Sequence, residues 1–183
     1  VIVAPYDAEL FGHWWFEGPE FLNQVCRAIA EPNCRIWMNT AGQYLNEYPE
    51  HAVCDPAPSS WGAGGYSAMW VDGSNDWIYR HVHRAELEMN ELAHRYQHET
   101  NAMTRRVLNL MGRELLLAQA SDWAFLMKTG TAVKYAVDRV KSHLGRFRKL
   151  REKLDLEQID LPWFYDLEKR DSLFPRLDYQ IFL

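Results

Sequence analysis

Apolar residues recur at alternating steps of four and three along residues 78–96, and this spacing constrains the fold more than any other feature. It places six side chains on one face of an α-helix: Ile78, Val82, Ala85, Met89, Leu92 and Tyr96. A second stripe predicts a helix over 131–154 and consists of Val133, Val137, Val140, Leu144 and Phe147. With a third helix predicted over 101–120, we expect residues 76–183 to form a helical bundle.

The beginning of the chain carries a different pattern. The apolar run Val1–Ala4 predicts a buried strand over Val1–Ala8, and a second strand is predicted around Arg35–Met38. One strand without partners is not stable. The sequence therefore leads us to expect a C-terminal piece of a longer protein, whose other strands lie upstream or on another chain.

Proline and threonine mark the starts of two further predicted helices in the first fifty residues. Proline can occupy the first turn of a helix, so a helix is predicted over Glu20–Ala30, and Thr40 is predicted to cap a helix over Ala41–Glu47. Residues 53–75 are predicted to be a glycine- and aromatic-rich loop, and residues 178–182 to be extended. Long loops in compact domains are usually functional or disordered.

Composition excludes several classes of protein. The 183 residues carry a net charge of -5 without a dominant basic stripe, which argues against nucleic acid as a partner. No apolar run approaches the length of a membrane span. Three cysteines without a paired spacing do not predict a disulfide framework and fit a reducing cytoplasm.

The segment Tyr6–Trp15 joins a carboxylate at a predicted strand end to glycine, histidine and tryptophan. Catalytic groups occupy the carboxyl ends of strands in βα barrels, and an acid beside aromatic rings suits a sugar site. Asp7 is thus a candidate acid. Glu9 would share the face of Asp7 on a strand, but a position beyond the strand end, where Glu9 bonds a neighbouring loop, is the favoured alternative.

The side chains that follow in this segment, His13, Trp14 and Trp15, can serve either function or structure. His13 can hydrogen-bond a sugar hydroxyl or a carboxylate, or it can serve as a structural residue at a helix start. Of Trp14 and Trp15, at least one is expected to pack in the core, because adjacent side chains diverge.

The glycine-rich loop and the following helices add three candidates. Trp61 and Trp70 can form stacking platforms for sugar rings, although tryptophan in a loop is often simply packed. Asp122 stands at a junction between two apolar helices, where it can cap a helix or contact a ligand.

Together these segments resemble the α-glucan branching enzymes of glycoside hydrolase family 57. The resemblance rests on four segments of the sequence: Tyr6–Trp15, Ser59-Ser60-Trp61-Gly62, Ala120-Ser121-Asp122-Trp123, and Phe174-Pro175 with Leu177-Asp178-Tyr179. It implies an incomplete (β/α)7 barrel followed by a helical C-terminal domain. On that basis we expect a mostly α chain in which residues 1–50 end the barrel, 51–75 form an active-site loop and 76–183 form the helical domain.

The same resemblance implies a chemistry and its participants. Asp7 is expected to be the general acid/base, and Trp61, Trp70 and Asp122 to line the glucan cleft, with less defined roles for His13 and Trp14. The family needs no metal or organic cofactor. In the family the nucleophile is a glutamate on an earlier barrel strand, which is not part of these 183 residues. We therefore do not assign Glu9 as the nucleophile.

Three functions remain open from the sequence. The first is part of a branching enzyme, acting on an α-glucan together with the missing barrel portion on the same or a separate chain. The second is an amylase or 4-α-glucanotransferase of the same family. The third is a stand-alone helical carbohydrate-binding or interaction module without activity.

Overall fold

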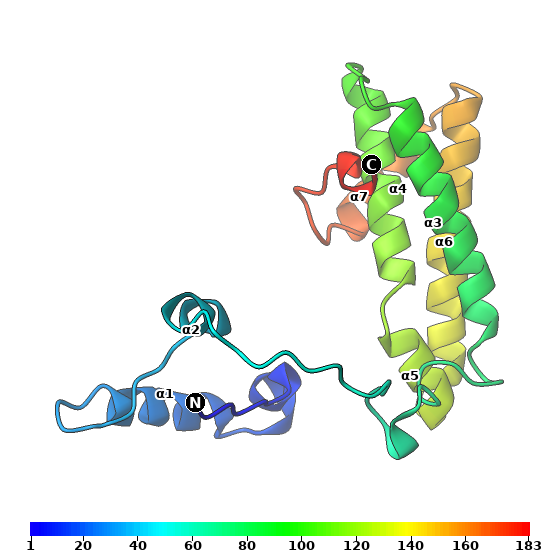
Figure 1. Cartoon of the computed structure of the whole chain (residues 1–183). Helices are drawn as coiled ribbons and strands as arrows, with labels where there is room; N and C mark the ends of the chain where they lie inside the picture. Colours follow the sequence, from blue (N-terminus) through cyan, green and yellow to red (C-terminus); the bar gives the residue numbers. More distant parts are fainter. The chain divides into compact units, whose positions relative to one another are not determined.

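The computed structural model describes residues 1–12 and 14–183, and the regular elements formed by these residues are helices (Figure 1). The chain divides into two compact units, Val1–Pro56 and Ala57–Leu183. The expectation of a mostly α chain is confirmed. Among the described residues, no helix is both long enough and apolar enough to cross a membrane.

The first unit contains a short π-helix and two α-helices. These are η1 (Leu10–Trp14), α1 (Gly18–Ile29) and α2 (Ala41–Glu47). Helix α2 has the predicted bounds because Thr40 and Gln43 form a capping box, in which each side chain bonds the backbone N–H of the other residue. Helix α1 begins two residues before the prediction.

The two strands predicted in this unit are not formed. Residues 1–7 and 36–40 have no regular secondary structure, and the side chains of Val1, Ile2 and Val3 are exposed. A strand needs a neighbour to pair its backbone N–H and C=O groups, and the described residues offer none. Apolar patterning alone therefore does not order this segment.

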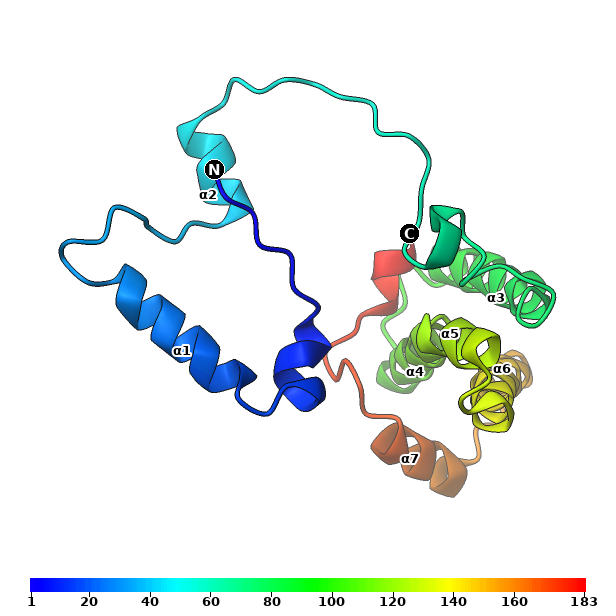
Figure 2. The ribbon, with the colours of Figure 1, turned by 90° about the horizontal axis from the view of Figure 1, so that it is seen from below.

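The second unit is built on three long helices that lie side by side. They are α3 (Trp77–Arg95), α4 (Ala102–Ala118) and α6 (Val133–Asp155), each in contact with the other two. Helices α3 and α4 form an antiparallel pair, and the short helix α5 (Asp122–Thr129) packs on α6 at one end of the bundle (Figure 1). Figure 2 shows the bundle from below, where α5 and the loop before α3 lie.

The predicted apolar stripes form the bundle core. From the stripe on α3, five of the six residues are buried: Ile78, Val82, Ala85, Met89 and Leu92. On α6, Val140, Leu144 and Phe147 are buried, whereas Val133 at the first turn is exposed. Burial of a large apolar side chain contributes roughly 1.5–3 kcal/mol, so these stripes stabilise the unit together with the buried apolar residues of α4 and α7.

The C-terminal segment is helical rather than extended. Helix α7 (Leu161–Arg170) was not anticipated, and the predicted extended stretch is a 3-10 helix, η3 (Tyr179–Phe182). Asp178 caps η3, and the buried Tyr179 donates a hydrogen bond from its hydroxyl to the carbonyl oxygen of Tyr96 (2.5 Å). The tail approaches α4 at Gly112, where a Cβ atom would lie 2.8 Å from the Phe182 ring.

Candidate functional site

Asp7, the predicted acid, is exposed and lies just before η1. Its carbonyl oxygen accepts a hydrogen bond from the N–H of Leu10 (3.2 Å). Because Ala8 and Glu9 are helical rather than extended, the strand argument that placed Asp7 and Glu9 on one face does not apply. Both carboxylates are exposed in this unit.

The aromatic residues that follow Asp7 divide between packing and exposure. Phe11 and Trp15 lie 5.9 Å apart by ring centroids, and Trp15 lies 4.9 Å from Phe21 on α1. Trp14, in contrast, is 73% exposed. Trp15 lies against these rings but is only half-buried, so the expectation that one of the adjacent tryptophans packs in the core stays a prediction. The candidate His13 lies outside the described residues.

In the second unit, the predicted pair Trp61 and Trp70 comes together. Their ring centroids are 5.7 Å apart, and Trp61 also lies 5.9 Å from the ring of Phe125 on α5. Trp61 is 58% exposed, while Trp70 and Phe125 are half-buried. Sequence reasoning missed Phe125, although it stands three residues after Asp122 in an apolar helix. We call Trp61, Trp70 and Phe125 the aromatic surface.

Backbone conformation explains how the loop presents Trp61. Gly62, Gly64 and Gly65 have φ angles of 110°, 79° and 71°, which side chains with a Cβ atom rarely adopt. The N–H of Ser67 donates to the Ser60 hydroxyl, and the N–H of Ser60 donates to Gly65 (both 2.6 Å). The loop is thus closed on itself around the short 3-10 helix η2 (Ala63–Gly65).

Two polar contacts hold this loop against α5. The buried Asn75 donates from Nδ2 to the carbonyl oxygens of Met69 and Ala124, at 3.1 Å each. Lys128 Nζ lies 2.7 Å from Asp72 Oδ2. This hydrogen bond from Lys128, with further bonds from Ser74, lowers the pKa of Asp72 to about 2. The loop and α5 therefore form one surface.

Asp122 is the first residue of α5 and is exposed. Ser121 occupies the N-cap position, so the reading of Asp122 as the cap is wrong. A carboxylate at the first turn is favoured by the partial positive charge of the helix N-terminus. Since residues three apart share a helix face, Asp122 lies on the face that carries Phe125. A carboxylate on α5 thus shares a helix face with one ring of the aromatic surface.

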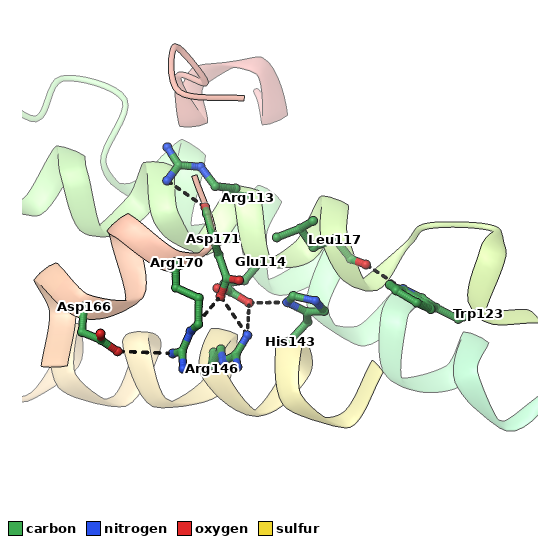
Figure 3. Close-up of polar contacts among 9 residues, drawn as sticks. All are labelled: Arg113, Glu114, Leu117, Trp123, His143, Arg146, Asp166, Arg170 and Asp171. Atoms are coloured by element: carbon green, nitrogen blue, oxygen red, sulfur yellow. Dashed lines mark hydrogen bonds and ion pairs between the residues drawn. The ribbon is translucent and has the colours of Figure 1, made fainter. Parts of the chain in front are cut away.

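A separate cluster of polar side chains is buried where α4, α6 and the end of α7 meet (Figure 3). His143 Nδ1 is hydrogen-bonded to Glu114 Oε2 (2.7 Å), and Arg146 Nη1 donates to Asp171 Oδ2 (2.8 Å). Arg113 Nη1 donates to the carbonyl oxygen of Asp171 (3.1 Å). Sequence reasoning did not identify this group, whose members are far apart along the chain.

Burial sets the charge of this buried cluster. Burial and the neighbouring carboxyl group of Asp171 raise the pKa of Glu114 to about 9, and burial lowers the pKa of His143 to about 4. At neutral pH the short contact between Glu114 and His143 thus joins two uncharged groups, although its geometry is that of an ion pair. The charged pair of the cluster is Arg146 with Asp171.

The spacing within this cluster also suits metal ligands, since ligand atoms of Glu114, His143 and Asp171 lie within 4.8 Å of one another. Arg146 Nη1, however, lies 2.8 Å from Asp171 and 4.0 Å from Glu114. The protein itself supplies the positive charge there, and a divalent cation would be repelled by it. We interpret the cluster as a structural connection among three helices.

Known proteins resemble this chain over most of its length. Residues 81–182 match the family model for the C-terminal region of 1,4-alpha-glucan branching enzyme. The branching enzyme TK1436 of Thermococcus kodakarensis is 37% identical over 180 residues, covering 95% of this chain and 26% of that protein.

Two solved structures share the arrangement of elements. The alpha-amylase AmyC of Thermotoga maritima is 41% identical with a TM-score of 0.74, over 99% of this chain and 33% of that one. The crystal structure of TK1436, a GH57 branching enzyme in complex with glucose and additives, is 34% identical with a TM-score of 0.82. It matches over 100% of this chain and 34% of that one.

These relatives carry the names of branching enzymes and of an alpha-amylase. The chain belongs to the 1,4-alpha-glucan branching enzyme family, whose C-terminal region it matches. It spans about a quarter to a third of the length of the relatives it matches.

Proposed function

We propose that this chain supplies the C-terminal part of an α-1,4-glucan branching enzyme. The observation that carries the proposal is the aromatic surface, in which the exposed Trp61 lies against Trp70 and Phe125. In this proposal residues 1–50 complete a catalytic barrel, residues 51–75 form a loop at its active site, and residues 76–183 form the helical domain. The barrel portion, on the same or a separate chain, is the partner.

The proposed reaction uses Asp7 twice. As an acid, Asp7 protonates the glycosidic oxygen of an α-1,4 bond while a glutamate of the barrel portion attacks the anomeric carbon. The leaving glucan departs with the proton, and a covalent glycosyl-enzyme remains. The Asp7 carboxylate then takes the proton of an acceptor 6-hydroxyl, which attacks the same carbon and forms an α-1,6 branch. Asp7 regains its proton and the glutamate is released.

The aromatic surface has the chemistry to bind the glucan chain. Sugar rings present apolar C–H faces, and these pack on indole rings with burial of area and defined geometry. Trp61 and Trp70 are proposed to hold successive parts of the glucan, and Asp122 to accept hydrogen bonds from its hydroxyls. His13 and Trp14, which follow Asp7, are proposed to contact the sugar near the cleaved bond.

Activity in this proposal requires two carboxyl groups, that of Asp7 and that of the glutamate in the barrel portion. Without the glutamate nucleophile no covalent intermediate forms, so the 183 residues alone are expected to be inactive. We place the complete enzyme in glycogen- or starch-type glucan metabolism in the cytoplasm.

The experiment is a branching assay on the natural polypeptide that contains this chain. Amylose is incubated with the protein, the product is debranched, and the chain lengths released are measured. New α-1,6 linkages are expected, while the 183 residues alone should produce none. A product without new branches would contradict the proposal, as would full activity of the 183 residues alone.

Hydrolysis is the second candidate, because the name of the matched Thermotoga maritima protein is alpha-amylase. The same assay separates the two reactions. Hydrolysis releases reducing ends in proportion to bonds cleaved, whereas branching conserves them. Reducing ends that rise without α-1,6 linkages would favour the amylase.

A further inference from the structure

A concave site lies between α3 and α6, within the bundle and apart from the aromatic surface. It has a volume of about 550 Å³. Its lining consists of Trp77, Arg80, His81, Val137, Lys141, Leu144 and Arg148. We call this site the basic groove. A volume of this order suits a small molecule.

The charge of the basic groove is one-sided. Arg80, Lys141 and Arg148 line it, and none of the described residues in its lining is a carboxylate. These three cations take part in none of the ion pairs of the described residues, even though Asp76 and Glu152 lie one turn from Arg80 and Arg148. A chain of net charge -5 thus leaves three cations around one concavity unpaired.

Two carboxylates on α3 and α6 are paired with other cations. Glu88 lies 2.6 Å from Arg84 and 2.5 Å from Arg151, and Asp138 lies 2.5 Å from Lys134. They are therefore committed to cations that do not line the groove. Arg80, Lys141 and Arg148, which take part in no ion pair of the described residues, are therefore available to an anion from solution.

His81 lies among these cations and is hydrogen-bonded to one of them. Arg80 Nε donates to His81 Nε2 (3.3 Å). Burial, followed by the charges of Arg80 and Arg148, lowers the pKa of His81. An anion between the two guanidinium groups would offset their charges, so the imidazole reports on occupancy of the groove.

Trp77 gives the groove an apolar wall. Its ring centroid lies 6.3 Å from that of His81, and Lys141 Nζ lies 5.9 Å above it. The groove therefore combines three cations with the indole ring of Trp77. Arginine donates paired hydrogen bonds to phosphate oxygens, and an indole packs against the ring of an attached organic group.

We propose that the basic groove binds a small phosphomonoester, such as a sugar phosphate, through Arg80, Arg148 and Lys141, with its organic part against Trp77. The proposal rests on the helical bundle alone and is independent of the proposed glucan chemistry. Free phosphate and a phosphorylated sugar share the recognised group. The contribution of Trp77 distinguishes them, because only the sugar phosphate can pack on the indole.

The test uses the 183-residue chain with inorganic phosphate, glucose 6-phosphate and glucose as probes, at constant ionic strength set with sodium chloride. Calorimetry measures affinity, and NMR follows the pKa of His81, identified by the loss of its signal in His81→Gln. We expect glucose 6-phosphate to bind more tightly than phosphate, glucose not to bind, and both phosphates to raise the pKa of His81.

Variants locate the site. Because hydrogen bonds to charged groups contribute strongly to the free energy of binding, the loss of each cation should raise the dissociation constant roughly tenfold. The double variant Arg80→Gln/Arg148→Gln should therefore lose about a hundredfold. Arg35→Gln, the same change at an exposed arginine of the first unit, should have no effect. If the double variant does not fold by circular dichroism, the exposed Lys141→Gln takes its place with a tenfold loss.

Three results would each overturn the proposal. They are unchanged affinity in the groove variants, binding of glucose equal to that of glucose 6-phosphate, and a response of His81 to chloride as large as its response to phosphate.

Discussion

The rings of Trp61 and Phe125 lie 5.9 Å apart and join a glycine-rich loop to helix α5. This contact, together with the bonds of Asn75 to Met69 and Ala124, makes the loop part of the bundle end. Trp61 remains 58% exposed in this fixed position. A rigid, exposed indole loses little conformational freedom when a ligand packs on it.

Replacing Trp61 should weaken binding of a linear α-1,4-glucan. Trp61→Ala removes the exposed platform and should raise the dissociation constant roughly tenfold, because an aromatic contact contributes about 0.5–1.5 kcal/mol beyond its buried area. Isothermal titration with a malto-oligosaccharide measures this. Tyr66→Ala is the matched control, since Tyr66 is 81% exposed on the same loop. Equal losses in the two variants would argue against a specific platform.

Asn75 is predicted to hold the loop on the bundle. Asn75→Ala leaves the carbonyl oxygens of Met69 and Ala124 without its amide and removes the acceptor of the Asp72 N–H. At about 1 kcal/mol for each hydrogen bond, the free energy of unfolding should fall by about 2–3 kcal/mol. Urea denaturation measures it, with the exposed Asn90→Ala on α3 as control. A change below 0.5 kcal/mol would contradict this role.

Because of Glu114, the free energy of unfolding should depend on pH above about pH 6.5. The folded protein keeps Glu114 protonated up to a pKa of about 9, whereas the unfolded chain has lost this proton. Unfolding therefore releases a proton, and the free energy of unfolding should fall as pH rises from 6.5 to 9. The slope contributed by one proton is at most about 1.4 kcal/mol per pH unit.

His143 acts in the opposite direction. Its pKa is lowered to about 4 in the folded protein, so unfolding takes up a proton between pH 4 and 6.5 and stability falls as pH falls through that window. Between about pH 4.5 and 6.5 the two effects oppose each other. Denaturation of Glu114→Gln, which retains an uncharged hydrogen-bonding group, should show no fall above pH 6.5 from this source. A parallel pH profile in both proteins would refute the assignment.

Lys128 is predicted to control the ionisation of Asp72. Its hydrogen bond is the largest cause of the low pKa, near 2, of that carboxyl group. In Lys128→Met the pKa of Asp72 should move up towards its usual value of 3.8, which NMR titration detects. Lys134→Met, whose partner is Asp138, is the control and should leave Asp72 unchanged.

Helices whose ends or buried faces are set by neighbouring residues could be predicted from the sequence. The Thr40 cap fixed α2, and the stripe from Ile78 to Leu92 fixed the buried face of α3. The stretch Val1–Ala8 had the pattern of a strand, but a strand also depends on neighbours that no local pattern contains. The helix η3 was not predicted either, because its conformation follows from the packing of Tyr179 on the bundle.

The candidate site was only partly predictable. Trp61 and Trp70 were found as residues and are in contact, but Phe125 joins them through the packing of α5, which spacing does not reveal. The buried contact of Glu114 with His143 links residues 29 apart on two helices, and its charge state follows from burial. Such groups have no sequence signal beyond a polar residue in an apolar helix.

The acid/base role of Asp7 is the central claim, and one comparison tests it most directly. In the natural polypeptide that contains this chain, turnover of amylose is measured for Asp7→Asn and for Glu9→Gln, both at exposed positions. Loss of a general acid/base costs roughly 10²–10⁴-fold. We predict a loss of this size for Asp7→Asn and little change for Glu9→Gln. Near-normal branching by Asp7→Asn would contradict the account.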